Sequence, residues 1–370
     1  MFNYQIAMYK YKIFESFDNE LEIIWKKTEL DKDKIFDTFD WHKSWHKNIG
    51  RLNGRALIIV IEDLSNDSFK KIIFPLIIKK YFFFTILEWS GYPFSDLNSP
   101  ISNKKINQSD IDYFLQILKI LKKTHEINIF IAINQINVDF IKVITKTKNF
   151  KLLNTSCHYF YNFKKEDFEL RKIKNLKYVI KDIQRQKRRF EEEISFINNP
   201  KDEKLKIKIF NKLIKFKYDQ YDRNKSWNYL KYTNYIEFLS SQINNQNIHL
   251  SALLVEDKII AVHMGYLYKK NFFYILPAYD YNYKKLSVGN ILLLELFENF
   301  KQNLNTFDFT IGEEIYKAKW TNNKNQAYDF IFYTDLKGFI FYIFMLSKKI
   351  IKKSNFLNKN IKFIYHFFKK

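Results

Sequence analysis

The sequence contains a single cysteine, Cys157, so it can form neither an internal disulfide nor a zinc site built on cysteines. The amino terminus lacks the uninterrupted apolar stretch and the small-residue cleavage site of a secretory signal. The longest apolar runs, IIFPLII at 72–78 and GFIFYIFML at 338–346, are far shorter than a transmembrane helix requires. These absences predict a cytoplasmic protein, in a reducing compartment, without a membrane-spanning helix.

Glycine and proline are also scarce, with 7 and 5 among 370 residues, whereas 46% of the residues are hydrophobic and 19% aromatic. This composition excludes a disordered, collagen-like or linker-dominated chain and predicts two domains or one large one. The formal net charge of +22 is typical of proteins that bind nucleic acid, anionic lipid or phosphorylated ligands. Nearly all of this charge is lysine, which is over-used throughout the chain. The few arginines therefore carry more information, and Arg185, Arg188 and Arg189 form a cluster.

Apolar periodicity and turn residues predict a mixed α/β unit over residues 1–155. Its expected elements are a helix at 34–48, strands at 55–63, 70–80 and 81–89, a helix at 109–123, a strand at 127–133, a helix at 137–146 and a strand at 150–153. The loop between 89 and 100 is rich in turn residues, which end the group of strands.

A similar order of elements begins again at Cys157 and predicts a second unit over residues 156–336. Its expected elements are a strand at 157–163, a long helix at 167–193, a strand at 195–198, helices at 203–222 and 232–243, strands at 249–257, 258–270 and 271–280, a helix at 291–300, a strand at 305–311, a short helix after Gly312 and a strand at 327–335. The fold class is therefore α/β (α+β), with two similar halves whose mixed, mostly antiparallel sheets are flanked by helices.

The segment 271–301 reads as strand, loop, glycine and helix. Ser287 and Asn290 are candidate helix caps, and Gly289 allows a ligand to approach the backbone. The free N–H groups at the start of this helix, beside Lys284 and Lys285, suit a pyrophosphate. The alternative is an ordinary helix start after a glycine turn.

The region from 249 to 320 resembles the acetyltransferase domain of the GNAT superfamily, in the branch named after CelD and related to the Fem peptidyltransferases. The matching motifs are RQKRRFEEEISF at 185–196, LLVEDKIIAVHMGY at 253–266, Ala278-Tyr279-Asp280, Ser287-Val288-Gly289, Phe307-Asp308-Phe309, Gly312-Glu313 and Tyr316-Lys317. The N-terminal half agrees more loosely, through Trp41, Trp45 and the phrase around Pro75. The main departure is Val288, which stands where the branch has a proline and leaves the loop less rigid.

The resemblance implies tandem GNAT-like domains and acetyl-CoA, or another acyl-CoA, as the acyl donor. It places the pantetheine arm between splayed strands at 271–280 and 305–311 and the pyrophosphate at the following helix. The cofactor-binding residues that it implies are Tyr279, Lys284, Lys285, Ser287, Gly289 and Asn290.

The resemblance further implies that Tyr316 protonates the departing thiolate. Glu313 is the nearest carboxylate to remove the amine proton. Substrate contacts are expected from Arg185, Arg188, Asp308 and Lys317. Each residue also has a structural alternative: a dipole-favoured helix carboxylate for Glu313, a packed aromatic for Tyr316, an exposed basic helix face for the arginines and a solvated lysine for Lys317. Asp308, in an aromatic strand, needs a polar partner.

The sequence therefore predicts an N-acyltransferase that moves an acyl group from acyl-CoA to an amine. The resemblance implies an amino sugar on a nucleotide or lipid carrier, from surface-polysaccharide or cell-envelope synthesis, as the acceptor. Two alternatives stay open: a Fem-like transferase that draws its acyl group from aminoacyl-tRNA, and a non-catalytic basic protein that binds RNA or membrane.

Two other features bear on partners. His42 and His46 have helical metal-ligand spacing but no third ligand nearby in the sequence, and we predict no metal. The segment 337–370 alternates aromatic blocks with lysine pairs, which suits either an interfacial helix on the inner face of an anionic membrane or a terminal helix packed on the body.

Overall fold

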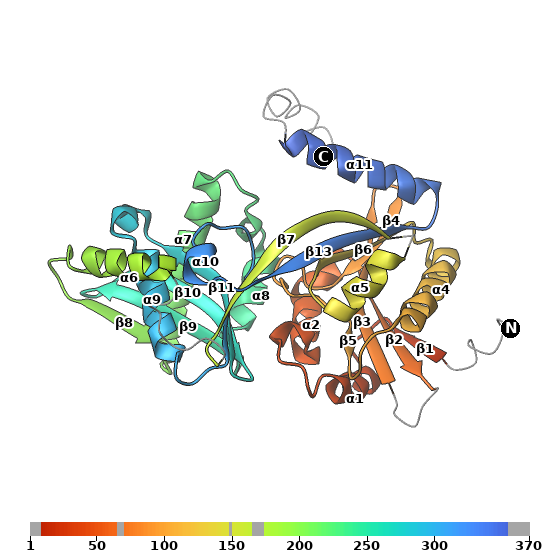
Figure 1. Ribbon diagram of the computed structural model, residues 1–370, viewed down its shortest axis with the longest axis horizontal. Helices are drawn as coiled ribbons and strands as arrows, with labels where there is room; N and C mark the ends of the chain where they lie inside the picture. Colours follow the sequence, from red (N-terminus) through yellow and green to blue (C-terminus); the bar gives the residue numbers. More distant parts are fainter. Residues whose placement is uncertain (1–8, 65–69, 148–149, 165–173, 354–370) are drawn as a thin grey trace.

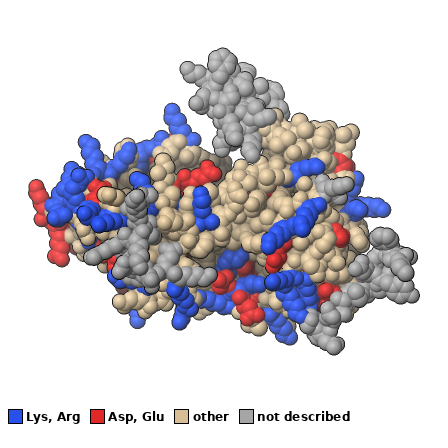
Figure 2. All heavy atoms as spheres, in the orientation of Figure 1, with Lys and Arg blue, Asp and Glu red and all other residues tan. Residues whose placement is uncertain are grey.

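The computed structural model describes residues 9–64, 70–147, 150–164 and 174–353. A single sheet of 13 strands runs through this part of the chain, in the order β1-β2-β3-β4-β6-β13-β7-β12-β11-β10-β9-β8, with β5 paired to β3. Figure 1 shows two halves joined by the long strands β7 and β13. Figure 2 shows basic side chains spread over the visible face and dense at the outer end of the C-terminal half, on the left.

The N-terminal half places its helices around strands that are apolar on both faces, which is why β2 and β3 read as nearly continuous hydrophobic runs. Its elements are β1 (Tyr9–Phe14), α1 (Asn19–Thr28), η2 (Ile35–Asp37), α2 (Phe39–Trp45), η3 (His46–Gly50), α3 (Arg51–Asn53), β2 (Arg55–Asp63), β3 (Lys70–Tyr81), β4 (Phe84–Trp89), β5 (Ile101–Ser102), α4 (Gln108–His125), β6 (Ile129–Gln135), α5 (Val138–Lys146) and β7 (Phe150–Asn162).

The C-terminal half packs α6 and α9 on one face of its strands and α7 on the other. Its elements are α6 (Lys174–Lys187), β8 (Ile194–Asn198), α7 (Glu203–Arg223), η4 (Tyr229–Lys231), α8 (Thr233–Ser241), β9 (Ile248–Val255), β10 (Lys258–Tyr268), β11 (Asn271–Tyr279), η5 (Tyr281–Leu286), α9 (Val288–Phe300), β12 (Thr306–Ile311), α10 (Lys317–Trp320) and β13 (Lys324–Tyr333). The last helix, α11 (Leu336–Lys353), packs on strands of the N-terminal half.

The expected class, a mixed and mostly antiparallel sheet flanked by helices, is confirmed. The described strand pairs β4–β6 and β11–β12 are parallel, and the other named pairs are antiparallel. Most expected elements occur within a few residues of their predicted bounds. The predicted helix at 34–48 is wrong in one respect, because Thr38 is extended and separates η2 from α2.

The structure differs most from expectation where the two halves meet. The strands expected at 150–153 and 157–163 are one strand, β7, because Asn154, Thr155 and Ser156 pair with β13 instead of turning. The expected boundary at 155/156 therefore falls inside β7. Strand β13 was expected to close the second unit, yet it pairs with β6 on one side and β7 on the other. The helix expected at 167–193 ends at Lys187, and residues 165–173 lie outside the described part.

Candidate functional site

Strands β11 and β12 diverge near the middle of the C-terminal half. They run parallel and, among the described residues, pair only from Asn271–Thr306 to Phe273–Asp308. Beyond that point β12 is distorted: Thr310 has a positive φ of 58° and Gly312 one of 149°. Among the described residues, the later part of β11 stays paired with β10 but has no strand partner on the side of β12, where an opening lies. This opening, here called the splay, is where the resemblance to the GNAT superfamily places the pantetheine arm.

Two buried lysines reach the diverging strands. The Nζ atom of Lys217, on α7, donates to the Pro277 carbonyl of β11 at 3.1 Å. The Nζ atom of Lys317 donates to the Ile311 carbonyl of β12 at 3.0 Å and lies 3.0 Å from the Glu314 carboxylate. Burial, helped by the Lys317 charge and opposed by Glu314, lowers the pKa of Lys217 to about 8. At the splay, a lysine from a neighbouring helix thus donates to a backbone carbonyl of each strand.

A carboxylate from the N-terminal half joins these lysines. Asp96 lies in the loop after β4 and accepts a hydrogen bond from Thr310. Burial of its carboxyl group raises the pKa of Asp96 to about 6, with Glu314 and Asp308 raising it further and Lys317 and Thr310 opposing them. Both protonation states of Asp96 are therefore accessible near neutral pH, as a proton-transfer group requires. The sequence analysis missed Asp96; its only local signal was the turn-rich loop around it.

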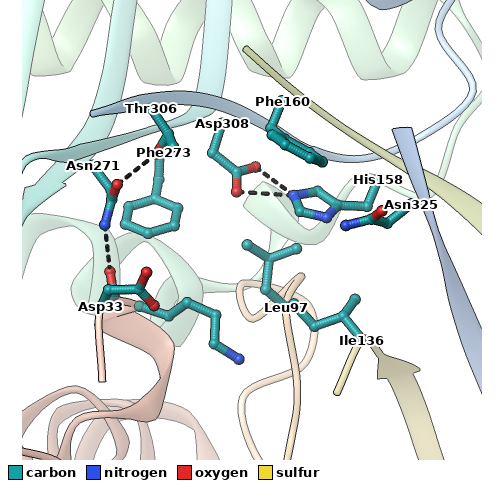
Figure 3. A pocket seen from close by; sticks show the side chains of 11 residues that line it. Asp33, Leu97, Ile136, His158, Phe160, Asn271, Phe273, Thr306, Asp308 and Asn325 are labelled. Carbon is teal, nitrogen blue, oxygen red and sulfur yellow. Dashed lines mark hydrogen bonds and ion pairs between the residues drawn. The ribbon is translucent and has the colours of Figure 1, made fainter. Parts of the chain in front are cut away.

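A pocket of about 200 Å³ adjoins this cluster and lies between the two halves. Figure 3 shows the side chains that line it: Asp33, Lys34, Leu97, Ile136, His158, Phe160, Asn271, Phe273, Thr306, Asp308 and Asn325. The lining is mixed, with apolar walls and several hydrogen-bonding groups. Binding sites for small polar molecules commonly have this character.

Asp308 has the partner that its sequence environment demanded. His158, on β7, approaches both carboxylate oxygens through Nε2 at 3.0 and 2.9 Å, and the Thr310 N–H donates to Oδ1 at 2.7 Å. His158 thus contacts Asp308 through Nε2. Its other ring nitrogen, Nδ1, is buried and has no protein partner in the described part of the chain. One imidazole nitrogen beside the pocket is therefore left without a hydrogen bond from the protein.

The predicted donor loop lies at the start of α9. Ser287 has a positive φ of 53° but its side chain does not cap the helix, contrary to expectation; its carbonyl accepts from the Asn290 and Ile291 N–H groups instead. Helix geometry leaves the Val288 and Gly289 N–H groups without intrahelical partners. The Tyr279 ring packs over this turn, 3.4 Å from the position of a Cβ atom on Gly289.

Basic side chains surround this loop. Lys284 and Lys285 are exposed on η5, and the Lys284 Nζ atom lies 5.1 Å from the Tyr281 ring. The Arg223 guanidinium, at the end of α7, lies 4.2 Å from the same ring. Arg223 was not singled out from the sequence. The loop thus combines free N–H groups with nearby positive charge, the combination that binds phosphate groups.

The two residues predicted to be catalytic have different surroundings. Glu313 is exposed, and the splay is instead approached by its neighbour Glu314. Burial, the Cys157 side chain and the Glu313 charge raise the pKa of Tyr159, which places Glu313 beside β7. Tyr316 is half-buried, and burial, with Tyr274 and Glu314, raises its pKa well above the usual value. A tyrosine in this state keeps its proton and can donate it.

The arginine cluster lies beside the donor loop. Arg185 forms an exposed ion pair with Asp182 at 2.6 Å, and Arg188 Nε donates to the Gln184 carbonyl. Phe190, which follows the cluster, stacks on Tyr283 of η5 with ring centroids 6.3 Å apart. None of the arginines lines the pocket between the halves.

Metal ligands are not grouped in the described residues: no three His, Cys, Asp or Glu side chains are placed to hold an ion. His42 is buried, with Nε2 2.9 Å from the Phe36 carbonyl and Nδ1 2.7 Å from Ser90 Oγ. These bonds give His42 a structural role in the core of the N-terminal half.

Comparisons with known proteins also point to the GNAT superfamily. Residues 177–318 match the family model described as an acetyltransferase (GNAT) domain. The FemX structure superposes with a TM-score of 0.60 at 8% identity, covering 89% of this chain and 99% of FemX. L-PGS from Bacillus licheniformis has a TM-score of 0.54 at 13% identity, covering 90% of this chain and 97% of that one.

A tandem GNAT protein from the clavulanic acid biosynthesis pathway has a TM-score of 0.52 at 4% identity, covering 88% of this chain and 100% of that one. No curated protein sequence matches this chain. At such low identities the solved structures establish the fold alone. Residues 177–318 thus match the GNAT acetyltransferase domain, and the described chain has a fold similar to those of FemX and of the tandem GNAT protein.

Proposed function

We propose that this protein transfers an acyl group from acyl-CoA to an amine, with the reaction at the splay. One observation carries the proposal: Lys217, Lys317 and Asp96 converge where β11 and β12 diverge. The phosphate-suited start of α9, which follows β11 after the short helix η5, is the binding site that we propose for the CoA pyrophosphate. The family match supports this class of donor.

The reaction requires stabilisation of the developing charge, a proton acceptor and a proton donor, and the described residues offer a candidate for each role. The amine nitrogen attacks the thioester carbonyl, the C–N bond forms and the C–S bond breaks. Lys217 and Lys317 offer N–H donors for the negative charge that develops on the carbonyl oxygen. Asp96, ionised above its pKa of about 6, accepts the amine proton. Tyr316 donates a proton to the thiolate.

This assignment moves the proton-accepting role from Glu313, as expected from the sequence, to Asp96. The reason is environmental. Glu313 is exposed, whereas Asp96 is half-buried and its carboxyl group lies beside Lys317 and Thr310. Removal of the carboxyl group from water brings its pKa close to neutral pH, where a general base is most effective.

The acceptor that fits the pocket is an amine that carries several hydroxyl groups. His158 Nδ1, which has no protein partner in the described residues, and the Asn325 side chain can form hydrogen bonds with hydroxyls, and Phe160 and Phe273 line the same pocket as apolar surfaces for a sugar ring. This lining supports an amino sugar as the acceptor, free or on a nucleotide or lipid carrier.

A second donor is an aminoacyl-tRNA, used in the manner of the Fem peptidyltransferases. The observation in its favour is the basic surface beside the donor loop, where Arg223, Lys284 and Lys285 lie near the arginine cluster. A nucleic acid backbone needs such an extended row of charges, whereas one pyrophosphate does not.

Calorimetric titration with CoA tests the proposal, with two variants at one position. Gly289→Ala adds only a Cβ atom, in ordinary contact with Tyr279, and so measures the steric effect of a Cβ atom beside the pyrophosphate without a charge. Gly289→Asp also adds a negative charge at the helix start and should weaken binding at least about tenfold. Melting temperatures of the two variants control for folding.

The outcomes separate the three functions. If the folded wild type does not bind CoA at millimolar concentration, the acyl-CoA proposal fails. Binding of tRNA that is sensitive to Gly289→Asp would then support the Fem-like donor, and tRNA binding that both Gly289 variants leave unchanged would support a non-catalytic RNA-binding protein.

A further inference from the structure

Helix α11 lies at the edge of the N-terminal half (Figure 1). Its sequence places apolar residues on two opposite sides of the helix. Its inner side inserts Phe341 among Phe84, Ile86, Ile129, Ile131 and Ile331. Its outer side exposes Leu336 by 72%, Ile340 by 53% and Ile343 by 47%. These three residues are spaced four and three apart, so they share one face of the helix, which Phe339 widens.

The turn between β3 and β4 extends this apolar face. Phe83 is 71% exposed, and Phe82 and Tyr81 are exposed beside it. The Tyr81 ring lies 6.3 Å from Phe341 on the inner side of α11, which holds the turn against the helix. Phe83 and Leu336 line the same shallow hollow, so the turn adjoins the outer side of α11 at Leu336. The turn and the outer side of α11 are here called the α11 face. Soluble monomers rarely leave a contiguous apolar surface of this kind uncovered, which indicates an interaction site.

The charge around the α11 face is positive. Lys80 and Lys337 are exposed next to it, and the sequence continues with Lys348, Lys349, Lys352 and Lys353. No acidic residue follows Asp335 in the sequence. Of the acidic groups nearby, Asp335 bonds to Asn128, Glu88 pairs with Lys79, and Glu126 lies across the hollow.

This pattern of charge favours lipid over a second copy of the chain. A two-fold dimer through the α11 face would bring equivalent lysines from both copies towards each other. An anionic bilayer instead meets both features, because its phosphates attract the lysines while apolar side chains enter the headgroup boundary. Within the described residues, no helix is long and apolar enough to cross a membrane.

We propose that the α11 face docks this protein onto the surface of an anionic lipid bilayer. Helix α11 lies in the plane of the membrane, and Phe83 and the outer residues of α11 enter the boundary between headgroups and acyl chains. The docking is independent of the acyl donor, since the α11 face belongs to the N-terminal half and the splay to the C-terminal half.

Co-sedimentation of the full chain with vesicles tests the proposal. We expect binding to vesicles of phosphatidylglycerol and phosphatidylcholine, and at least tenfold weaker binding to phosphatidylcholine alone. The variant Ile340→Ser with Ile343→Ser should reduce binding to the anionic vesicles at least tenfold, because two inserting side chains are lost. Phe83→Ser tests the turn separately and should also weaken binding.

A matched control removes two exposed isoleucines elsewhere. Ile23, on α1, is 58% exposed and Ile207, on α7, is 50% exposed, so Ile23→Ser with Ile207→Ser makes the same chemical change away from the α11 face. This control should bind vesicles like the wild type. Equal losses in both double variants, or no binding of the wild type to anionic vesicles, would overturn the proposal. A dimer that Ile340→Ser with Ile343→Ser dissociates, without vesicle binding, would assign the face to a second copy instead.

Discussion

Asp96 and Glu313 show how surroundings separate two carboxyl groups that a sequence cannot rank. Asp96 accepts a hydrogen bond from Thr310 and is enclosed near Lys317, whereas Glu313 is exposed. Burial raises the pKa of Asp96 to about 6, so the carboxylate is the major form above that pH. A base that works in this form gives a rate that rises with pH through its pKa.

We therefore expect Asp96→Asn to lower kcat by about 10²- to 10⁴-fold, the usual contribution of a general base, and to flatten the acidic limb of the pH profile near pH 6. Asparagine keeps the size of the side chain and an acceptor for Thr310. Glu313→Gln is the matched control, for which kcat should stay near the wild-type value. Steady-state kinetics across pH 5–9 gives both results, and the reverse pattern would return the role to Glu313.

His263 is a buried histidine without a hydrogen-bond partner in the described residues. Both ring nitrogens are shielded from solvent, and the ring stacks on Tyr274 with centroids 4.3 Å apart. Burial lowers the pKa of His263 well below its usual value, with the His249 and Lys217 charges adding to the effect. The folded state thus holds His263 neutral, while the unfolded state takes up a proton below about pH 6.5.

Because only the unfolded state takes up this proton, His263 makes the free energy of unfolding smaller as pH falls below about 6.5. We expect His263→Leu, which cannot be protonated, to gain free energy of unfolding relative to the wild type as pH falls from 7 to 5. The gain should approach roughly 1.4 kcal/mol per pH unit. Urea denaturation at pH 7, 6 and 5 measures it, and a difference that does not change with pH would contradict the prediction.

The wild type and His263→Leu have to be compared with each other, because other buried groups titrate in the same pH range. Burial raises the pKa of Glu29 to about 7 and that of Asp96 to about 6, so both gain protons on folding and oppose the histidines. The same two carboxyl groups are present in the wild type and in His263→Leu, so their contribution cancels in the difference.

At the scale of elements, local pattern was enough wherever a segment carries its own signal. The order of strand, loop and helix from β11 to α9, with Gly289 at the start of the helix, was predicted because apolar runs and turn residues mark each boundary. The side-chain cap expected from Ser287 was wrong, because the residue adopts a left-handed conformation that a sequence pattern does not specify.

Contacts between residues that are far apart in the sequence could not be predicted from local sequence patterns. Lys217 is one of many lysines on α7, and only the packing of that helix on β11 distinguishes it from its solvated neighbours. Asp308 could be predicted to need a partner, but not to find it in His158, 150 residues away. Asp96 reaches Thr310 because the N-terminal half packs against the splay.

At the scale of the whole molecule, the two halves share strands and a core. Strand β13 pairs Phe330 with Ala132 of β6 and with Leu152 of β7. One hydrophobic cluster joins Trp41 and Leu97 of the N-terminal half to Leu250 and Phe273 of the C-terminal half. Each half therefore depends on residues that lie in the other half of the sequence.

A cut at the boundary expected from the sequence, 155/156, divides β7 and removes β13 from β6. The fragment 1–155 would expose Ile129 and Ile131, which Ile331 of β13 helps to bury, and the fragment 156–336 would lose the partner strand of β13. We expect neither fragment to fold alone, judged by amide dispersion in NMR spectra, and the full chain to unfold in one transition. Co-expression of the two fragments should restore a folded complex, since all native strand pairings can then form. Two well-separated transitions in the full chain, or a folded isolated fragment, would show instead that the halves are independent domains joined by a shared sheet.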